Sequence, residues 1–443
     1  MPWCTVRQEY LDRGCRWRLL SSYFGTSSFT RNPAILYTIR HDEAEAAKTT
    51  RIPAIAMQRT DSGIRHYLTM ISYWTILLLA CAPVFGQQYT ISTIGGNAAA
   101  GAFLSNPTSV AVDQRGDVYV ADWSGFIRKI WVRDGAISII AGIGILGYSG
   151  DGGQATNAML GRSISIALDA AGNIYLADGD NNRIRRIDIS TRIITTVAGT
   201  GAAVDSGDGG PAVNAGVSRP TGITVDAAGD LYFSSSWSRV RKLTANSGTI
   251  ETIAGQLTTS FGGDDGLAVD ALFWDPIPSV VDRNGNVYIV DYENSRVRMV
   301  TASMGIVTTL AGSGACATGG PFDVLVCQGG FRGDGGPAKN AILNHAAAMA
   351  SDVDGNLYVA DTINHRIRRV DASTGLISTI AGNGVNGFSG DGGPAIDAEI
   401  SFPAGIAVDG SGRVYFADEN NGRIRVLIPV APASYPFRQS RRR

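Results

Sequence analysis

Histidine and cysteine are scarce in this chain of 443 residues, which contains 4 histidines and 5 cysteines. His41 and His66 lie near the start, so only His345 and His365 remain for the rest of the chain. Two histidines cannot form a three-histidine zinc site. No G-x-S-x-G segment, the nucleophile elbow of α/β-hydrolases, occurs either. We therefore predict no catalytic residue, no metal site and no cofactor.

Long apolar runs are also rare. The clearest is ISYWTILLLACAPVFGQQ at residues 71–88, which is uncharged, too short to span a membrane and followed by the small-residue sequence V-F-G. This pattern predicts a signal peptide over residues 70–87, a secreted or periplasmic protein and no membrane span in the mature chain. The LLAC sequence at 78–81 resembles a lipobox, so a lipid anchor on Cys81 stays open as an alternative.

The two ends of the chain lack any regular pattern. A signal peptide normally begins at the first residue, so residues 1–69 are predicted to be an unstructured or mis-assigned N-terminal extension, with Met57 or Met70 as the true start. Residues 431–443 end in RQSRRR and are predicted to be a disordered basic tail.

Positive charge is low between these ends. Residues 87–437 contain 24 Lys and Arg against 33 Asp and Glu, a net charge of −9. An acidic surface repels a phosphate backbone, so we predict no nucleic-acid partner.

One phrase occurs six times, at intervals of 56 or 57 residues and one interval of 70. Its copies are GDVYVAD (116–122), GNIYLAD (172–178), GDLYFSS (229–235), GNVYIVD (285–291), GNLYVAD (355–361) and GRVYFAD (412–418). Such a period is typical of propellers and solenoids. Short β-branched runs bounded by Gly, Asn, Asp and Ser predict four strands per repeat, as in a propeller blade.

The fourth strand is missing from the last repeat. Five copies resemble ISTIAG (377–382), and the sixth, ISTIGG (91–96), precedes the first repeat. We predict that this segment completes the last blade and leaves no open edge between the two ends of the ring. The predicted fold is all-β: a six-bladed β-propeller over residues 88–430, with four-stranded antiparallel blades closed by an N-terminal strand.

The combination of GIAVD, GNLYVAD, NHRIRRV and ISTIAG resembles the NHL repeat family, and the GDGGPA connectors resemble its six-bladed exported bacterial members. The resemblance covers residues 88–430. It implies a six-bladed propeller, a fold that serves protein binding, RNA binding, sensing and occasionally catalysis, so it does not choose among these functions.

The GDGG connectors could present carboxylates to calcium. One carboxylate per blade cannot supply six oxygens to one ion, so we interpret the connectors as tight turns after which Pro211, Pro337 and Pro394 start short helical turns. A second set of carboxylates ends the second strands, and the spacing predicts ion pairs across the next loop. The pairs are Asp178–Arg183, Asp291–Arg296, Asp361–Arg366 and Asp418–Arg423.

Residues that break the repeat are the best candidates for ligand contact, because loops carry binding residues on a regular scaffold. On the face formed by the loops from strand 2 to strand 3, they are Trp123, Asp180, Trp237, Tyr292, Glu293, His365 and Glu419. Exposed aromatic and carboxylate side chains suit stacking on a sugar or a peptide. The starts of the six first strands, near Thr108, Ser163, Thr221, Pro278, Ala346 and Ala404, offer no carboxylate.

Only Cys316 and Cys327 follow the predicted signal peptide, and they bracket an insertion between the fourth and fifth repeats. Two cysteines in one loop of an exported protein predict a disulfide, because a metal site would need further ligands.

These observations predict a monomeric, exported, non-enzymatic scaffold for an unknown protein or carbohydrate ligand. The alternative is a metal-dependent lactonase or lyase. A central channel lined by small apolar residues would favour the scaffold, and an acid-lined channel would favour the enzyme.

Overall fold

The computed structural model describes residues 17–22, 36–41, 87–96, 104–314 and 331–430. Residues 1–84 and 85–443 form two separate units. In the first unit, β1 (Trp17–Ser22) and β2 (Leu36–His41) pair antiparallel, a feature that the sequence analysis did not predict. None of the described residues belongs to a helix long and apolar enough to cross a membrane.

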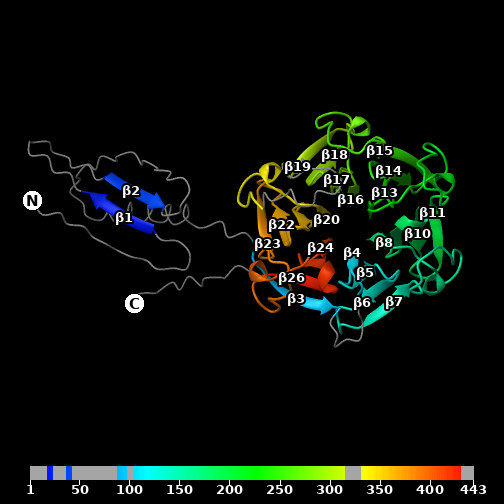
Figure 1. Cartoon of the computed structure of the whole chain (residues 1–443), viewed down its shortest axis with the longest axis horizontal. Helices are drawn as coiled ribbons and strands as arrows, with labels where there is room; N and C mark the ends of the chain where they lie inside the picture. The colour runs from blue at the N-terminus through cyan, green and yellow to red at the C-terminus, as the bar shows by residue number, and fades with distance from the viewer. Residues whose placement is uncertain (1–16, 23–35, 42–86, 97–103, 315–330, 431–443) are drawn as a thin grey trace, which may run out of the picture. The chain divides into compact units, whose positions relative to one another are not determined.

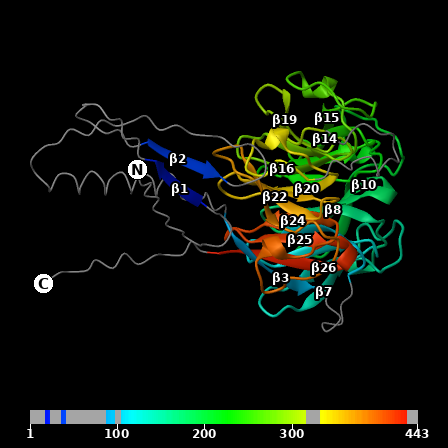
Figure 2. The same cartoon turned by 60° about the vertical axis from the view of Figure 1, so that its left-hand side comes forward.

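The second unit contains six four-stranded antiparallel sheets that follow one another around a ring (Figures 1 and 2). Blade 1 is β4 (Pro107–Val112), β5 (Val118–Asp122), β6 (Ile127–Ile130) and β7 (Ile137–Ala141). Blade 2 is β8 (Ser163–Leu168), β9 (Ile174–Asp178), β10 (Arg183–Ile187) and β11 (Ile194–Ala198). Blade 3 is β12 (Ile223–Val225), β13 (Leu231–Ser235), β14 (Arg239–Thr244) and β15 (Thr249–Ala254). Blade 4 is β16 (Pro276–Val281), β17 (Val287–Asp291), β18 (Arg296–Val300) and β19 (Val307–Ala311). Blade 5 is β20 (Ala346–Ser351), β21 (Leu357–Asp361), β22 (Arg366–Val370) and β23 (Ile377–Ala381). Blade 6 is β24 (Pro403–Val408), β25 (Val414–Asp418), β26 (Arg423–Pro429) and β3 (Tyr89–Gly95).

The predicted closure is confirmed. β3 pairs antiparallel with β26, with Thr93 opposite Arg425. On its other side, Ile91 exchanges backbone hydrogen bonds with Gly392 and Gly393 of the connector before blade 6, at 2.8 and 3.2 Å. The equivalent bonds in blade 2 join Ile194 to the connector before that blade. The N-terminal strand therefore fills the same place as the fourth strand of an ordinary blade.

Apolar side chains pack between neighbouring blades. Each connector from the second blade onward contains a 3-10 turn, and in three of them Pro211, Pro337 or Pro394 immediately precedes it, as predicted. Soon after the turn comes an apolar residue at most 1% exposed; the five residues are Leu160, Val217, Phe273, Leu343 and Ile400. Burial of these side chains holds adjacent sheets together.

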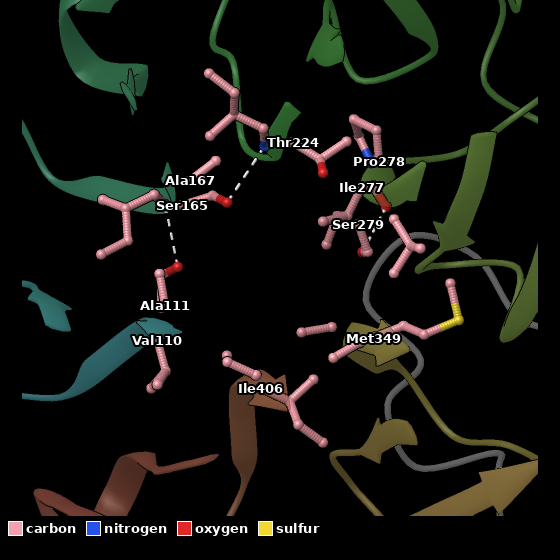
Figure 3. A pocket seen from close by; sticks show the side chains of 18 of the residues that line it. Val110, Ala111, Ser165, Ala167, Thr224, Ile277, Pro278, Ser279, Met349 and Ile406 are labelled. Carbon is pink, nitrogen blue, oxygen red and sulfur yellow. Dashed lines mark hydrogen bonds between the residues drawn. The ribbon is translucent and has the colours of Figure 1, made fainter. Parts of the chain in front are cut away.

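The first strands lie nearest the axis and approach one another closely (Figure 1). Ser109 Oγ accepts a hydrogen bond from Ile166 N at 3.0 Å, and Ser165 Oγ accepts one from Ile223 N at 3.2 Å (Figure 3). At Gly405 a Cβ atom would lie 2.4 Å from Ser109 Cα, so this contact between blades 6 and 1 requires glycine.

The predicted ion pairs were wrong, because each strand-end aspartate pairs with the arginine two residues after the predicted one. Asp178 and Arg183 are opposite each other in the ladder, as expected, but Arg183 extends over the Tyr148 ring and donates to backbone carbonyls. Arg185, on the same side of the strand, is fully buried, and its Nη1 lies 3.4 Å from Asp178 Oδ2. Only the deeper arginine shares the enclosed space of the aspartate. The same shift makes the other pairs Asp291–Arg298, Asp361–Arg368 and Asp418–Arg425.

The connector carboxylates complete these buried arginine sites. Asp151 accepts hydrogen bonds from Arg185 Nε and Nη2 at 3.0 and 2.6 Å and from Thr196 N at 2.9 Å. Arginines at the same position of the next four blades are at most 1% exposed and pair with the connector aspartates Asp208, Asp264, Asp334 and Asp391. The GDGG aspartates are thus bound within their own blades.

Blade 3 departs from this arrangement. Ser235 stands where the other five blades have the strand-end aspartate, and Asp205 stands where the connectors before blades 2, 4, 5 and 6 have Tyr148, Phe261, Phe331 and Phe388. Ser235 Oγ donates to Asp205 Oδ1, and Ser218 N donates to both side chains at 3.1 and 3.3 Å. In blade 3 this buried carboxylate therefore belongs to the connector, whereas in the other blades it belongs to the second strand.

Candidate functional site

A cavity of about 560 Å³ lies along the axis of the ring, and the first strands of all six blades line it. Val110, Ile277 and Ile406 line this space together with small residues such as Ala111 and Ser165 (Figure 3). Along the first strands the lining is therefore made of apolar and small residues.

The mouth of the cavity on the side of the strand 2 to strand 3 loops is different. Trp237, Tyr292 and Glu419, from the loops of blades 3, 4 and 6, join the lining there. All three were predicted site residues, and the closed ring brings them to the same cavity.

Asp275 also lines the cavity, which corrects the expectation of no carboxylate at the starts of the first strands. It immediately precedes β16 and has a left-handed backbone with φ of 52°. Its backbone N–H donates to Trp237 O at 2.7 Å, and Thr221 Oγ1 donates to Asp275 Oδ1 at 3.1 Å.

A signal for Asp275 was present in the sequence. The residues at the entry to the first strands of blades 1, 3, 4, 5 and 6 have positive φ and differ widely in chemistry: Asn106, Asp275, His345 and Phe402 directly precede the strand, and Arg219 lies four residues before β12. The residue at the entry to the first strand therefore varies from blade to blade, and this variation is visible in the sequence.

The carboxyl groups at the mouth are held in an unfavourable setting for negative charge. Burial raises the pKa of Asp275 to about 7 despite the Thr221 hydrogen bond, and the nearby Glu293 and Asp291 carboxylates add to the rise. Burial alone raises the pKa of Glu419 to about 7. Desolvation disfavours the ionised form, so both groups titrate near neutral pH.

Tyr292 shares this cavity lining with Asp275 and Glu419. Burial raises the pKa of its hydroxyl, and the negative charges of Glu293, Asp275 and Glu419 raise it further. Glu293 is itself paired with His345, with Oε2 3.3 Å from Nε2. The His345 ring contacts Tyr292 edge-on at 5.1 Å.

The other predicted site residues lie outside the cavity lining. Trp123 is 45% exposed, with the Arg162 guanidinium 5.7 Å from its ring centroid, and Asp180 Oδ2 accepts a hydrogen bond from Arg162 N at 3.3 Å. His365 Nδ1 accepts one from Phe402 N at 3.3 Å and thus joins blades 5 and 6. Burial and the neighbouring Arg366 lower the pKa of His365.

Two further predictions are not decided by this geometry. Cys316 and Cys327 lie outside the described residues, so the disulfide stays a prediction. Within the described ranges, no group of three or more His, Cys, Asp and Glu side chains is arranged to hold a metal ion.

Comparisons with known proteins agree with the repeat. A family model described as NHL repeat matches residues 401–427. NHL repeat-containing protein 2 of Bos taurus is 28% identical over 279 residues, which cover 57% of this chain and 37% of the relative. Protein SUPPRESSOR OF QUENCHING 1, chloroplastic, of Arabidopsis thaliana is 27% identical over 304 residues, 65% of this chain and 27% of the relative. The chain thus spans well under half the length of these two relatives.

A solved structure shares the fold. An auxiliary nutrient binding protein from Bacteroides thetaiotaomicron aligns with a TM-score of 0.53 and 13% identity, over 94% of each chain. The six repeats and the closed ring make this chain a six-bladed β-propeller, residues 401–427 match the NHL repeat, and the chain is similar in sequence to an NHL repeat-containing protein.

Proposed function

We propose that this propeller is an exported binding scaffold, which holds part of a protein or glycan ligand at the mouth of its central cavity and catalyses no reaction on it. The observation that carries the proposal is the mouth itself, where Trp237 and Tyr292 stand beside Asp275 and Glu419 above an apolar cavity. Aromatic side chains supply large contact areas at low entropic cost, and polar groups beside them give specificity.

Trp237 is the best anchor for such a ligand. It is 41% exposed, and the Arg219 guanidinium lies 4.7 Å from its ring centroid. A partly exposed, supported aromatic ring at a cavity mouth is typical of residues that dominate binding energy. The Bacteroides neighbour is described as nutrient-binding, but a likeness at 13% identity supports the fold alone, so the proposal rests on the cavity.

Arrays of glycans and of peptides, probed with the full chain, test this function. The Trp237→Ala variant should lose binding to the ligands that the wild type captures, by about 30-fold, the usual effect of truncating a hot-spot aromatic residue. Trp123→Ala is the matched control, because Trp123 is equally exposed on the same face but does not line the cavity. Equal losses in both variants, or no loss in Trp237→Ala, would contradict the proposed site.

The enzyme alternative is favoured by one observation, the carboxyl groups of Asp275 and Glu419 in the same cavity lining as Tyr292. Among the described residues these side chains do not form a group that could hold a metal ion, so we derive no metal-dependent step from them. Hydrolysis of a panel of lactones with calcium or zinc added, and abolished in Asp275→Asn, would support the enzyme against the scaffold.

The proposed export rests on residues 70–87 and on the two cysteines. Mass spectrometry of the mature protein from its native host should show a chain that begins near Gln87, or one lipidated on Cys81. It should also show a Cys316–Cys327 disulfide, which would contribute roughly 2–3 kcal/mol by closing a short loop. A mature chain that retains Trp3 to Ala56, with free thiols, would contradict export.

A further inference from the structure

We propose that the mouth of the cavity recognises a protonated primary amine carried on an aliphatic stem. This inference rests on the proposed binding function and specifies the chemistry of the ligand. It follows from the balance of charge at the mouth, from the shape of the cavity below it, and from a contrast with the rest of the fold.

The charge balance of the cavity is negative. Asp275 and Glu419 are the acidic groups in its lining, and no Lys, Arg or His among the described residues lines it. The charged groups that influence Asp275 electrostatically are Glu293, which pairs with His345; Asp291, which pairs with Arg298; and Arg219. The Arg219 guanidinium lies over Trp237 and makes no salt bridge to Asp275 within the described part of the chain.

Elsewhere this fold neutralises its enclosed carboxylates. Asp178, Asp361 and Asp418 are fully buried, and each lies within 3.4 Å of a buried guanidinium nitrogen. A carboxylate taken out of water costs free energy unless it is paired. Asp275 and Glu419 have no such cation among the described residues, so a ligand cation would supply the missing partner.

Loop positions equivalent to Glu419 make the contrast sharper. The residue that follows the second strand is Gly179 in blade 2, Ser236 in blade 3 and Thr362 in blade 5. The repeat therefore folds without a charge at this position, and the Glu419 carboxylate of blade 6 is available to bind a ligand.

The cavity favours an organic cation over a metal ion. Trp237 and Tyr292 can face a cation with their ring surfaces, and Ile277, Val110 and Ile406 can pack on an aliphatic stem below. Calcium would require six or more oxygen ligands, whereas the described lining supplies two carboxylates. A lysine side chain of a peptide and a free alkylamine share the required chemistry.

The test uses the full chain and two probes of equal size, n-hexylamine and n-hexanol, in titration calorimetry at pH 8. Hexylamine should bind at least about tenfold more tightly than hexanol, because charge-assisted hydrogen bonds are roughly twice as strong as neutral ones. Asp275→Asn and Glu419→Gln should each remove about tenfold of this difference and leave hexanol binding unchanged. Asp354→Asn, an exposed aspartate outside the cavity lining, is the control.

The dependence of hexylamine affinity on pH provides an independent test. The amine stays protonated at pH 8 and pH 5.5, whereas Asp275 and Glu419, with pKa values of about 7, bind protons between these values. Hexylamine affinity should therefore fall more than tenfold at pH 5.5, and binding near pH 7 should release protons, seen as a heat that depends on the buffer. Equal binding of the two probes, or no binding of hexylamine, would overturn the amine inference.

Two competition arms identify the source of the amine. A peptide with one lysine and 1,5-diaminopentane are each titrated with hexylamine bound, and the stronger competitor shows whether the site takes a side chain or a free amine. If array ligands bind through Trp237 but never compete with hexylamine, the scaffold function stands and the amine inference fails. If Trp237→Ala leaves the array ligands bound as well, the proposed site fails with it.

Discussion

The exchange of residues in blade 3 permits a demanding test of how this fold places its buried charge. The other four blades that have a GDGG-type connector combine an aromatic residue there with an aspartate at the end of the second strand, and blade 3 combines Asp205 with Ser235. We predict that Ser235→Asp alone is strongly destabilising. Ser235 is fully buried and hydrogen-bonds Asp205, whose side chain is 2% exposed, so the variant would place two carboxylates in contact.

The cost follows from Coulomb's law. Two charges about 4 Å apart at an effective dielectric constant of about 20 repel by about 4 kcal/mol. Protonating one aspartic acid at pH 7 costs about the same amount, so the loss of stability should be roughly 2–4 kcal/mol. Asp205→Phe alone should cost about 1–3 kcal/mol, because Ser235 loses its acceptor.

The double variant Asp205→Phe, Ser235→Asp restores the combination found in the other four blades. There the aromatic ring would lie under Arg239, as Phe261 lies 3.6 Å from the Arg296 guanidinium, and the new aspartate would face Arg241. Urea unfolding of the four proteins gives the coupling energy, which should favour the double variant by at least about 2 kcal/mol. Effects that add to within about 0.5 kcal/mol would refute the reasoning.

Three further predictions concern the ring and its mouth. Gly405→Ala should lower stability by about 2 kcal/mol or more in urea unfolding, because the new Cβ would lie 2.4 Å from Ser109 Cα. Gly410→Ala is the control and should have little effect, because no atom lies within 4 Å of its Cβ position. Equal effects of the two variants would contradict the close approach of β24 and β4. Deletion of residues 88–96 should cause aggregation or a large fall in Tm, because β26 loses its neighbour β3, and a Tm within a degree or two of wild type would contradict the closure. Asp275→Asn should stabilise the fold at pH 8 by roughly 1–4 kcal/mol and have little effect at pH 4. The native pKa of Asp275 is about 7 against an ordinary 3.8, so the stability of the wild type falls as the pH rises between these values. The same dependence of stability on pH in the variant and the wild type would contradict the assignment.

The fold could be predicted almost completely because the repeat expresses it six times. The number of blades, the four strands of each blade and the place of residues 91–96 all follow from comparing copies, and β3 pairs with β26 as that comparison requires. The β1–β2 pair occurs once, without a repeated pattern to reveal it.

Side-chain partners were harder to predict than strands. Arg183 and Arg185 lie on the same side of β10, so spacing alone could not decide which one reaches Asp178; burial of Arg185 decides it. Tyr292 and Glu419 could be identified because they interrupt a repeated loop. Asp275 was missed because it precedes the first strand, and its role appears only when the ring closes around the cavity.

The carboxyl pKa values at the mouth test the central claim most directly. Carboxyl-carbon NMR titration of the full chain, with Asp275→Asn and Glu419→Gln to assign the resonances, measures both groups with and without hexylamine. Our account predicts pKa values of about 7 for Asp275 and Glu419 in the free protein, and lower values with the amine bound. Ordinary values near 4 for both groups, unmoved by the amine, would contradict it.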